Sequence, residues 1–226
     1  MTTILITGTN RGIGLELAIQ ALAKGWTVYG SARQPVTGPA ADICAHPNFH
    51  NLVFDVTDDA AVRRSAAGLD AAIDILINNA GVIGYEPQST LDMDFEGFAR
   101  TLAINTLAPL RVSQAFLPHL ERSSHPRILS VSSNMSRMSH AKSDQIAYRA
   151  SKAALNKVMQ GLATDLAPRG VAVALVNPGW VRTDMGGPEA DISVEESASG
   201  VLAVAAGLTL ASTGRFFNRD GTEPGW

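Results

Sequence analysis

The sequence predicts an α/β protein built on a doubly wound parallel sheet. Short runs rich in valine and isoleucine alternate with longer stretches of helical periodicity, as expected where crossover helices connect parallel strands. Several of the runs are apolar on both faces, which is typical of strands covered by helices on both sides. A chain of 226 residues with 46% hydrophobic residues suffices for one such domain, and no repeat or composition shift divides it. We therefore expect a single domain over residues 1–226.

Seven short apolar runs are predicted to be strands. They cover residues 3–7, 27–31, 51–54, 73–77, 127–131, 171–176 and 214–217. Right-handed crossovers place successive units first on one side and then on the other side of the first strand. The result is a Rossmann-type sheet with helices on both faces, in which a ligand is expected at the carboxyl edge, where the strand order reverses.

Helices are predicted where apolar residues recur at steps of three and four. One amphipathic stretch runs from residue 15 to residue 24. Leu155, Met159 and Leu166 belong to a buried stripe that predicts a helix over 146–167, which Pro168 ends. The Ser-x-x-Glu sequence at 193–196 has the form of a capping box and starts a helix to about residue 207. The segment 34–39, rich in proline and glycine, is predicted to be a surface loop.

Charge and composition exclude several classes of partner. Eighteen Lys and Arg against twenty-one Asp and Glu give a formal charge of −3, without the basic excess typical of nucleic-acid or anionic-membrane binding. The longest apolar stretches, 171–176 and 201–206, fall far short of the ~20 residues of a membrane span. Cys44 is the single cysteine, and the five histidines lack metal-ligand spacing. We expect a soluble, cytoplasmic protein with no metal, nucleic acid or membrane partner.

Three glycines follow the first predicted strand. Gly8, Gly12 and Gly14 open the first helix in the order G-x-x-x-G-x-G. Glycine admits backbone angles closed to other residues and lets a diphosphate reach bare main chain and the positive end of the helix dipole. The pattern predicts a dinucleotide-binding turn. Its order differs from the commonest fingerprint, G-x-G-x-x-G, so a glycine-rich turn without a ligand is the alternative.

Polar residues follow several other predicted strands. Asp55 follows the third strand, residues 78–81 follow the fourth, 132–133 the fifth and 177–179 the sixth. Any one of these groups could serve only its own turn. Because parallel strands end at the same edge of a sheet, the groups together favour a ligand site there.

Tyr148 and Lys152 lie near the start of the long predicted helix. Residues four apart on a helix share a face, so the spacing places an ammonium beside a phenol. A nearby cation stabilises phenolate, and we expect it to lower the pKa of the tyrosine towards neutrality, which suits proton transfer. The alternative is a half-exposed helix on which the two side chains have no joint role.

In their order along the chain, these motifs resemble those of the short-chain dehydrogenase/reductase (SDR) family. The resemblance covers almost the whole chain, and residues 177–185 and 214–226 are similar to the branch of C-factor signalling proteins and sniffer-type carbonyl reductases. The matching motifs are Thr7-Gly8-x-x-x-Gly12-x-Gly14, Asp55-Val56, Asn78-Asn79-Ala80-Gly81, Asn105, Ser132-Ser133, Tyr148-x-x-x-Lys152 and Pro178-Gly179-x-x-x-Thr183.

The resemblance implies a role for each catalytic residue. Tyr148 would be the general acid, Ser133 would polarise the carbonyl oxygen, and Lys152 would acidify the tyrosine and bind the nicotinamide ribose. Asn105 would hold a water that reprotonates the lysine.

The serine departs from the family pattern. It usually lies about thirteen positions before the tyrosine, whereas Ser133 lies fifteen before Tyr148 and Met135 stands at thirteen. Two extra residues are expected in the loop 134–146. Ser133 is preferred because it directly ends a strand, and Ser136 is the rival.

The expected cofactor is NADP(H) rather than NAD(H). The second strand ends in Ser31-Ala32-Arg33, without the carboxylate that binds the NAD ribose, so Arg33 and Arg11 are predicted to hold a 2′-phosphate. The alternative is that both are ordinary surface arginines. The full set of predicted cofactor-binding residues is Gly8, Asn10, Arg11, Gly12, Ile13, Gly14, Arg33, Asp55, Val56, Asn79, Ala80, Gly81, Tyr148, Lys152, Pro178, Gly179, Val181 and Thr183.

The function implied by the resemblance is NADPH-dependent reduction of a ketone or aldehyde, or oxidation of the matching alcohol. A dinucleotide-binding signalling protein of the C-factor type, with little turnover, is the alternative. A nucleotide-sugar epimerase is disfavoured by the glycine spacing and by the short chain. The family also implies a homodimer or homotetramer formed through the helices that carry Asn105 and Tyr148.

Overall fold

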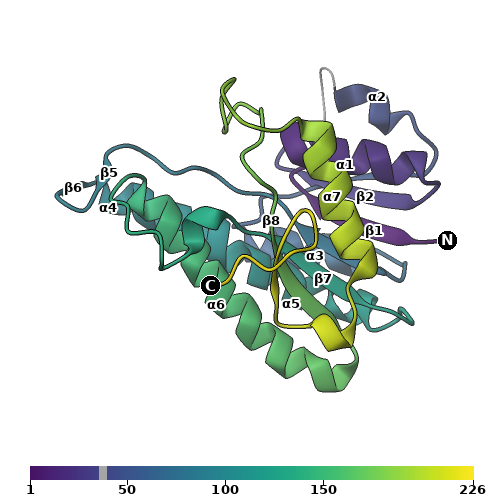
Figure 1. Ribbon diagram of the computed structural model, residues 1–226. Helices are drawn as coiled ribbons and strands as arrows, with labels where there is room; N and C mark the ends of the chain where they lie inside the picture. The colour runs from purple at the N-terminus through teal and green to yellow at the C-terminus, as the bar shows by residue number, and fades with distance from the viewer. Residues whose placement is uncertain (36–39) are drawn as a thin grey trace.

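A parallel sheet organises the protein, as the sequence predicts. The computed structural model describes residues 1–35 and 40–226, and within them seven parallel strands pair in the order β3-β2-β1-β4-β7-β8-β9 (Figure 1). The order reverses between β1 and β4, which are direct neighbours. The strands are β1 (Thr3–Thr7), β2 (Thr27–Ala32), β3 (Phe49–Val53), β4 (Ile75–Asn78), β7 (Arg127–Val131), β8 (Ala172–Asn177) and β9 (Phe216–Asn218).

All seven predicted strands are present, and each end lies within two residues of its predicted position. The predicted strand 51–54 begins earlier, because Phe49 already pairs with Val28 of β2. The predicted strand 73–77 begins later, at Ile75, because the Ile73 N–H donates to the carbonyl oxygen of His119 instead of to a neighbouring strand.

Helices cover both faces of the sheet. The helices α1 (Gly12–Ala23) and α7 (Val194–Gly207) lie together on one face, and α3 (Asp59–Ala67), α5 (Ala108–Leu120) and α6 (Ile146–Leu166) pack on the other (Figure 1). The remaining elements are α2 (Ala41–Cys44), α4 (Phe95–Leu102), the π-helix η2 (Ala103–Leu107), the 3₁₀ turns η3 (Asn134–Ser136), η4 (Ala167–Arg169) and η5 (Leu210–Ser212), and the hairpin strands β5 (Gln88–Ser89) and β6 (Asp92–Met93).

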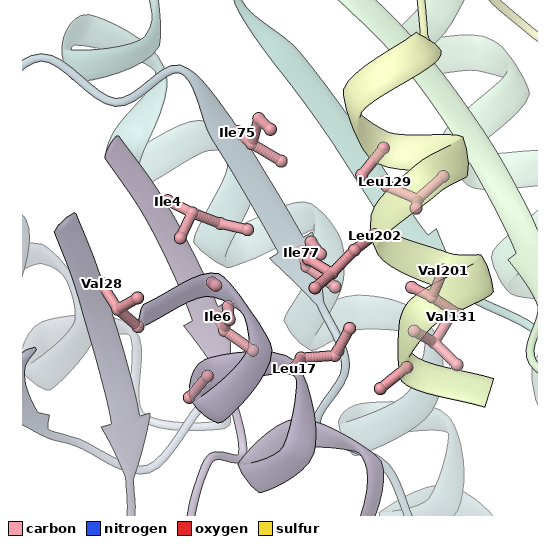
Figure 2. Packing of buried hydrophobic residues seen from close by; sticks show 14 of the residues in the cluster. Ile4, Ile6, Leu17, Val28, Ile75, Ile77, Leu129, Val131, Val201 and Leu202 are labelled. Carbon is pink, nitrogen blue, oxygen red and sulfur yellow. The ribbon is translucent and has the colours of Figure 1, made fainter. Parts of the chain in front are cut away.

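Alternate residues of the central strands feed two separate cores. Ile4 and Ile6 of β1 pack with Leu17 of α1 and Leu202 of α7 (Figure 2). Leu5, between them, belongs to the opposite cluster, whose members include Leu76, Phe116, Leu155 and Met159. This alternation explains why the strands are apolar throughout: each face of the sheet is buried by its own helices.

The helix ends agree with the sequence, with one exception. The Ser193 hydroxyl accepts a hydrogen bond from the Glu196 N–H at 3.1 Å, which confirms the predicted cap of α7. The first helix begins at Gly12 rather than at residue 15, because the glycine turn itself provides its first turn. Of the predicted loop 34–39, residues 36–39 lie outside the described residues.

Glycine is required at position 14 for reasons of space. A Cβ there would lie 2.1 Å from the Gly8 carbonyl oxygen and 2.4 Å from Nδ2 of Asn79. We expect Gly14→Ala to lower the free energy of unfolding by ~2 kcal/mol or more, through overpacking. In contrast, the described residues leave the Cβ position of Gly161 free within 4 Å, so Gly161→Ala in α6 should raise stability by ~1 kcal/mol. Urea denaturation of the two variants measures both changes in the free energy of unfolding, and equal changes would contradict the packing argument.

Candidate active site

The glycine turn forms one wall of the site. Gly8 and Gly12 have φ angles of +77° and +54°, in the left-handed region that favours glycine. Arg11 occupies the N-cap position, and among the described residues no side chain caps α1 or places an acidic group in its first turn. The first N–H groups of the helix, which include that of Ile13, are therefore available to an anion. Asn10 is an exposed residue of the turn.

The end of β4 lies against this turn. Nδ2 of Asn79 donates to the carbonyl oxygen of Thr7 at 2.9 Å, and the Asn79 and Ala80 N–H groups both donate to the Thr7 hydroxyl at 3.0 Å. Gly81 follows, and a Cβ there would lie 3.6 Å from Nζ of Lys152. The structure thus brings the predicted residues 79–81 between the glycine turn and the lysine.

Asp55 and Arg33 lie at the neighbouring strand ends. Burial raises the pKa of Asp55, but hydrogen bonds from Thr57 and the charges of Arg33 and Arg111 outweigh it, so the pKa lies below its usual value. Arg33 itself is exposed. Val56 is buried, and its carbonyl oxygen accepts from Arg111 at 3.0 Å.

The loop after β8 closes the site from the side of α7. Gly179, which follows Pro178, has a φ of +86°, and Val181 is buried. The Thr183 side chain approaches Gly12, since a Cβ on that glycine would lie 3.5 Å from Cγ2 of the threonine. Arg11 pairs with Asp184 of the same loop at 3.0 Å, and both side chains are largely exposed. The structure therefore links the loop to the glycine turn.

Tyr148 and Lys152 share a buried face of α6, as their spacing predicts. Nζ of Lys152 lies 5.9 Å from the centroid of the Tyr148 ring and donates a hydrogen bond to the Val131 carbonyl oxygen at 2.8 Å. Their exposed fractions are 8% and 5% respectively. Burial of the ammonium lowers the pKa of Lys152 to about 8.

The predicted lowering of the tyrosine pKa is wrong for this structure. Burial raises the pKa of Tyr148, and the hydrogen bond with Ser133 offsets that effect only in part. The reason is geometric: the ammonium faces the tyrosine ring and donates to Val131, so desolvation of the phenolate outweighs its stabilisation. The phenol is accordingly held in its protonated form at neutral pH.

The two candidate serines face different ways. The Ser133 hydroxyl lies beside the Tyr148 phenol, whose pKa it lowers, and accepts from the Met135 N–H at 3.1 Å. The Ser136 hydroxyl is buried, donates to the Ser133 carbonyl oxygen at 2.6 Å and accepts from Nδ2 of Asn156 at 2.8 Å. The geometry favours Ser133 as the serine beside the phenol, while its catalytic role stays a prediction.

Asn105 lies within the π-helix η2 and is fully buried. Its Oδ1 accepts from the Val82 N–H at 2.9 Å, and its Nδ2 donates to the Val82 carbonyl oxygen at 2.8 Å and to the Ser151 hydroxyl at 2.9 Å. Short π-helical insertions occur often at functional sites. Here the insertion joins the segment after β4 to the helix that carries Tyr148.

Two residues near the tyrosine were not predicted from the sequence. Gln88, from the hairpin, is buried, and its Oε1 accepts from the Tyr148 N–H at 3.1 Å, so it caps α6 from 60 residues away. Asn156 is buried one turn beyond Lys152. An amide within an apolar helical stripe could have indicated Asn156, whereas the role of Gln88 depends on tertiary contact alone.

The described residues also bear on other classes of site. Among residues 1–35 and 40–226, no group of three or more His, Cys, Asp or Glu side chains could hold a metal ion. In the same part of the chain, every helix is too short or too polar to cross a membrane.

Comparisons with known proteins agree with this geometry. A model of the short chain dehydrogenase family matches residues 2–192. C-signal of Myxococcus xanthus is 44% identical over 155 residues, which are 68% of this chain and 93% of that protein. NADPH-bound carbonyl reductase from chicken fatty liver is 31% identical with a TM-score of 0.91, covering 100% of this chain and 99% of that chain. Carbonyl reductase Sniffer of D. melanogaster is 30% identical with a TM-score of 0.90, covering 100% of both chains.

A doubly wound sheet with a glycine turn and a buried Tyr–Lys pair at its carboxyl edge defines a class of dinucleotide-binding oxidoreductases. The chain belongs to the short-chain dehydrogenase/reductase family and is of the C-factor and sniffer type.

The lowered pKa of Lys152 makes the free energy of unfolding depend on pH in the alkaline range. Between about 8, the value in the folded protein, and 10.5, the ordinary value, the unfolded chain binds the proton and the folded protein does not. The free energy of unfolding should therefore rise with pH across this interval, by up to ~3 kcal/mol from this group. Urea denaturation of the wild type and Lys152→Met from pH 7 to 10.5 isolates the effect, because other groups cancel in the difference. Parallel curves would show that the pKa is not lowered.

Proposed function

We propose that this protein is an NADPH-dependent carbonyl reductase. The observation that carries the proposal is the cluster of Tyr148, Ser133 and Lys152, which lies beside the glycine turn at the carboxyl edge of the sheet. The substrate class is a ketone or aldehyde, with the matching secondary or primary alcohol in the reverse direction. Residues 1–226 are proposed to act as one domain, and the assembly is proposed to be a homodimer or homotetramer.

The residues of the site fit a dinucleotide. Gly14 lets α1 pack tightly against the Gly8 carbonyl oxygen and Asn79, and Gly12 exposes the start of α1 to a diphosphate. Asp55 is proposed to accept from the adenine amino group, and Arg33 to bind the 2′-phosphate of NADP(H). The NADPH bound by the chicken carbonyl reductase supports this choice over NAD(H). Of the other predicted residues, Val181 and Thr183 are proposed to fix the nicotinamide carboxamide.

Each catalytic side chain has a distinct task. When bound, NADPH supplies a hydride to the substrate's carbonyl carbon. The Ser133 hydroxyl donates a hydrogen bond to the carbonyl oxygen, on which negative charge builds, and the Tyr148 phenol gives that oxygen a proton. The raised pKa keeps the phenol protonated and able to donate.

Lys152 acts on the phenolate that Tyr148 becomes when it gives up its proton. Its ammonium, 5.9 Å from the tyrosine ring, stabilises the phenolate after proton transfer. With a pKa of about 8, the lysine is mostly charged at neutral pH and can also pass on a proton. Asn105 is proposed to hold the water through which the lysine regains it.

Removal of the phenolic hydroxyl tests the mechanism. We expect Tyr148→Phe to lower kcat by ~10²- to 10⁴-fold, because the proton donor is lost, while NADPH still binds. NADPH oxidation followed by absorbance over a panel of aldehydes, ketones and quinones gives the rates, and fluorescence titration gives the Kd. Equal rates for the two proteins would end the catalytic proposal.

Substitution of Arg33, at the end of β2, tests whether the protein prefers NADPH over NADH. Arg33→Ala should raise the KM for NADPH roughly 10- to 100-fold by removing charge-assisted hydrogen bonds, and should leave the KM for NADH unchanged. Arg122→Ala, which removes an exposed arginine paired with Asp70, serves as the matched control. A wild-type preference for NADH that Arg33→Ala does not alter would refute the assignment.

The similarity to C-signal supports a second candidate function. At 44% identity over 68% of the chain, it favours a dinucleotide-binding signalling protein with little turnover. The same measurements separate the two functions: tight NADPH binding without oxidation on any of the carbonyl compounds would favour signalling.

A further inference from the structure

Asn156 lies on the face of α6 that carries the Tyr–Lys pair. It follows Lys152 by four residues and Tyr148 by eight, so the three side chains form one row. The residue is 5% exposed, and both polar atoms of its amide have a partner: the Ser132 hydroxyl donates to its Oδ1 at 2.5 Å, and its Nδ2 donates to the Ser136 hydroxyl at 2.8 Å.

The two serines bound by Asn156 flank Ser133. The Ser136 hydroxyl and N–H both donate to the Ser133 carbonyl oxygen, at 2.6 and 3.0 Å. On the other side, the Ser132 N–H donates to the Val176 carbonyl oxygen of β8 at 2.7 Å. The turn that contains Ser133 is therefore held between the sheet and α6.

We propose that Asn156 is a positioning residue, which sets the Ser133 hydroxyl relative to the Tyr148 phenol. This inference rests on the proposed carbonyl reduction. Tyr148 and Asn156 belong to one helix, so the phenol and the anchor of the serine turn keep a fixed separation. Removal of the amide would leave the Ser132 and Ser136 hydroxyls buried without this partner and would free the turn to shift. A displacement of about 1 Å at a reacting group can cost as much as ~100-fold in rate.

A double-mutant cycle tests whether Asn156 acts through Ser133. Asn156→Ala should lower kcat about tenfold or more in the wild-type background, with the Kd for NADPH changed less than about twofold. In the Ser133→Ala background, the same substitution should change kcat less than about twofold, because the group that it positions is gone. The same loss in both backgrounds, or a parallel loss of NADPH binding, would overturn the proposal.

Thr213→Val is the matched control for a lost hydrogen bond. The Thr213 hydroxyl accepts from the Val173 N–H at 2.9 Å and donates to the Val173 carbonyl oxygen at 3.2 Å, near the start of β8 and therefore at the edge of the sheet opposite the proposed catalytic and cofactor-binding residues. It should lower the Tm while kcat stays within about twofold of wild type. If Asn156→Ala does not fold, Ser136→Ala removes the same link to Ser133, and the cycle is run with that variant.

Amide hydrogen exchange tests the inference without measuring catalytic turnover. The Ser136 N–H, which is bonded to the Ser133 carbonyl oxygen, should exchange with solvent about tenfold faster in Asn156→Ala, as measured by NMR. Unchanged exchange would overturn the inference. Full activity of Ser133→Ala would instead count against the proposed role of the serine in catalysis.

Discussion

The hydrogen bond from Nζ of Lys152 to the Val131 carbonyl oxygen fastens α6 to the end of a central strand. A buried ammonium is costly unless its protons find acceptors, and the carbonyl oxygen and the face of the tyrosine ring meet that need here. Tyr148, one turn earlier, and Asn156, one turn later, lie on the same face of α6. The contact therefore ties to the sheet the row of side chains that includes the phenol and the anchor of the serine turn.

Much of the architecture can be predicted from the sequence because its causes are local or periodic. Strands buried on both faces must be apolar throughout, and the runs at 3–7 and 127–131 match β1 and β7. The cap at Ser193 is a contact over three residues, and it is present. The glycine turn could be predicted because its backbone angles leave few alternatives to glycine. The ends of strands are predicted less accurately where a backbone group bonds to a distant residue instead of to a neighbouring strand, as the Ile73 N–H does with the His119 carbonyl oxygen.

The positions of the candidate site residues could be predicted from the sequence, but their electrostatics could not. Helical spacing established that Tyr148 and Lys152 share a face, and it could not show that the ammonium would turn to Val131 while burial raised the tyrosine pKa. The sequence likewise could not show that the Ser136 hydroxyl is bonded to Asn156, twenty residues further along the chain. Gln88 shows the same limit: nothing near it in the chain indicates that it caps the helix that carries Tyr148.

The π-helix at Ala103–Leu107 constrains the chain in a further way. A π-turn holds about one residue more than an α-turn, which shifts the phase between α4 and α5 by about 100°. Deleting one residue there would let the two helices merge into a regular α-helix, but either Asn105 would leave Val82 and Ser151 or Phe116 would rotate out of the core. A change of side chain at Leu107, which is 49% exposed, is therefore easier to accommodate than a change in the number of residues in the segment.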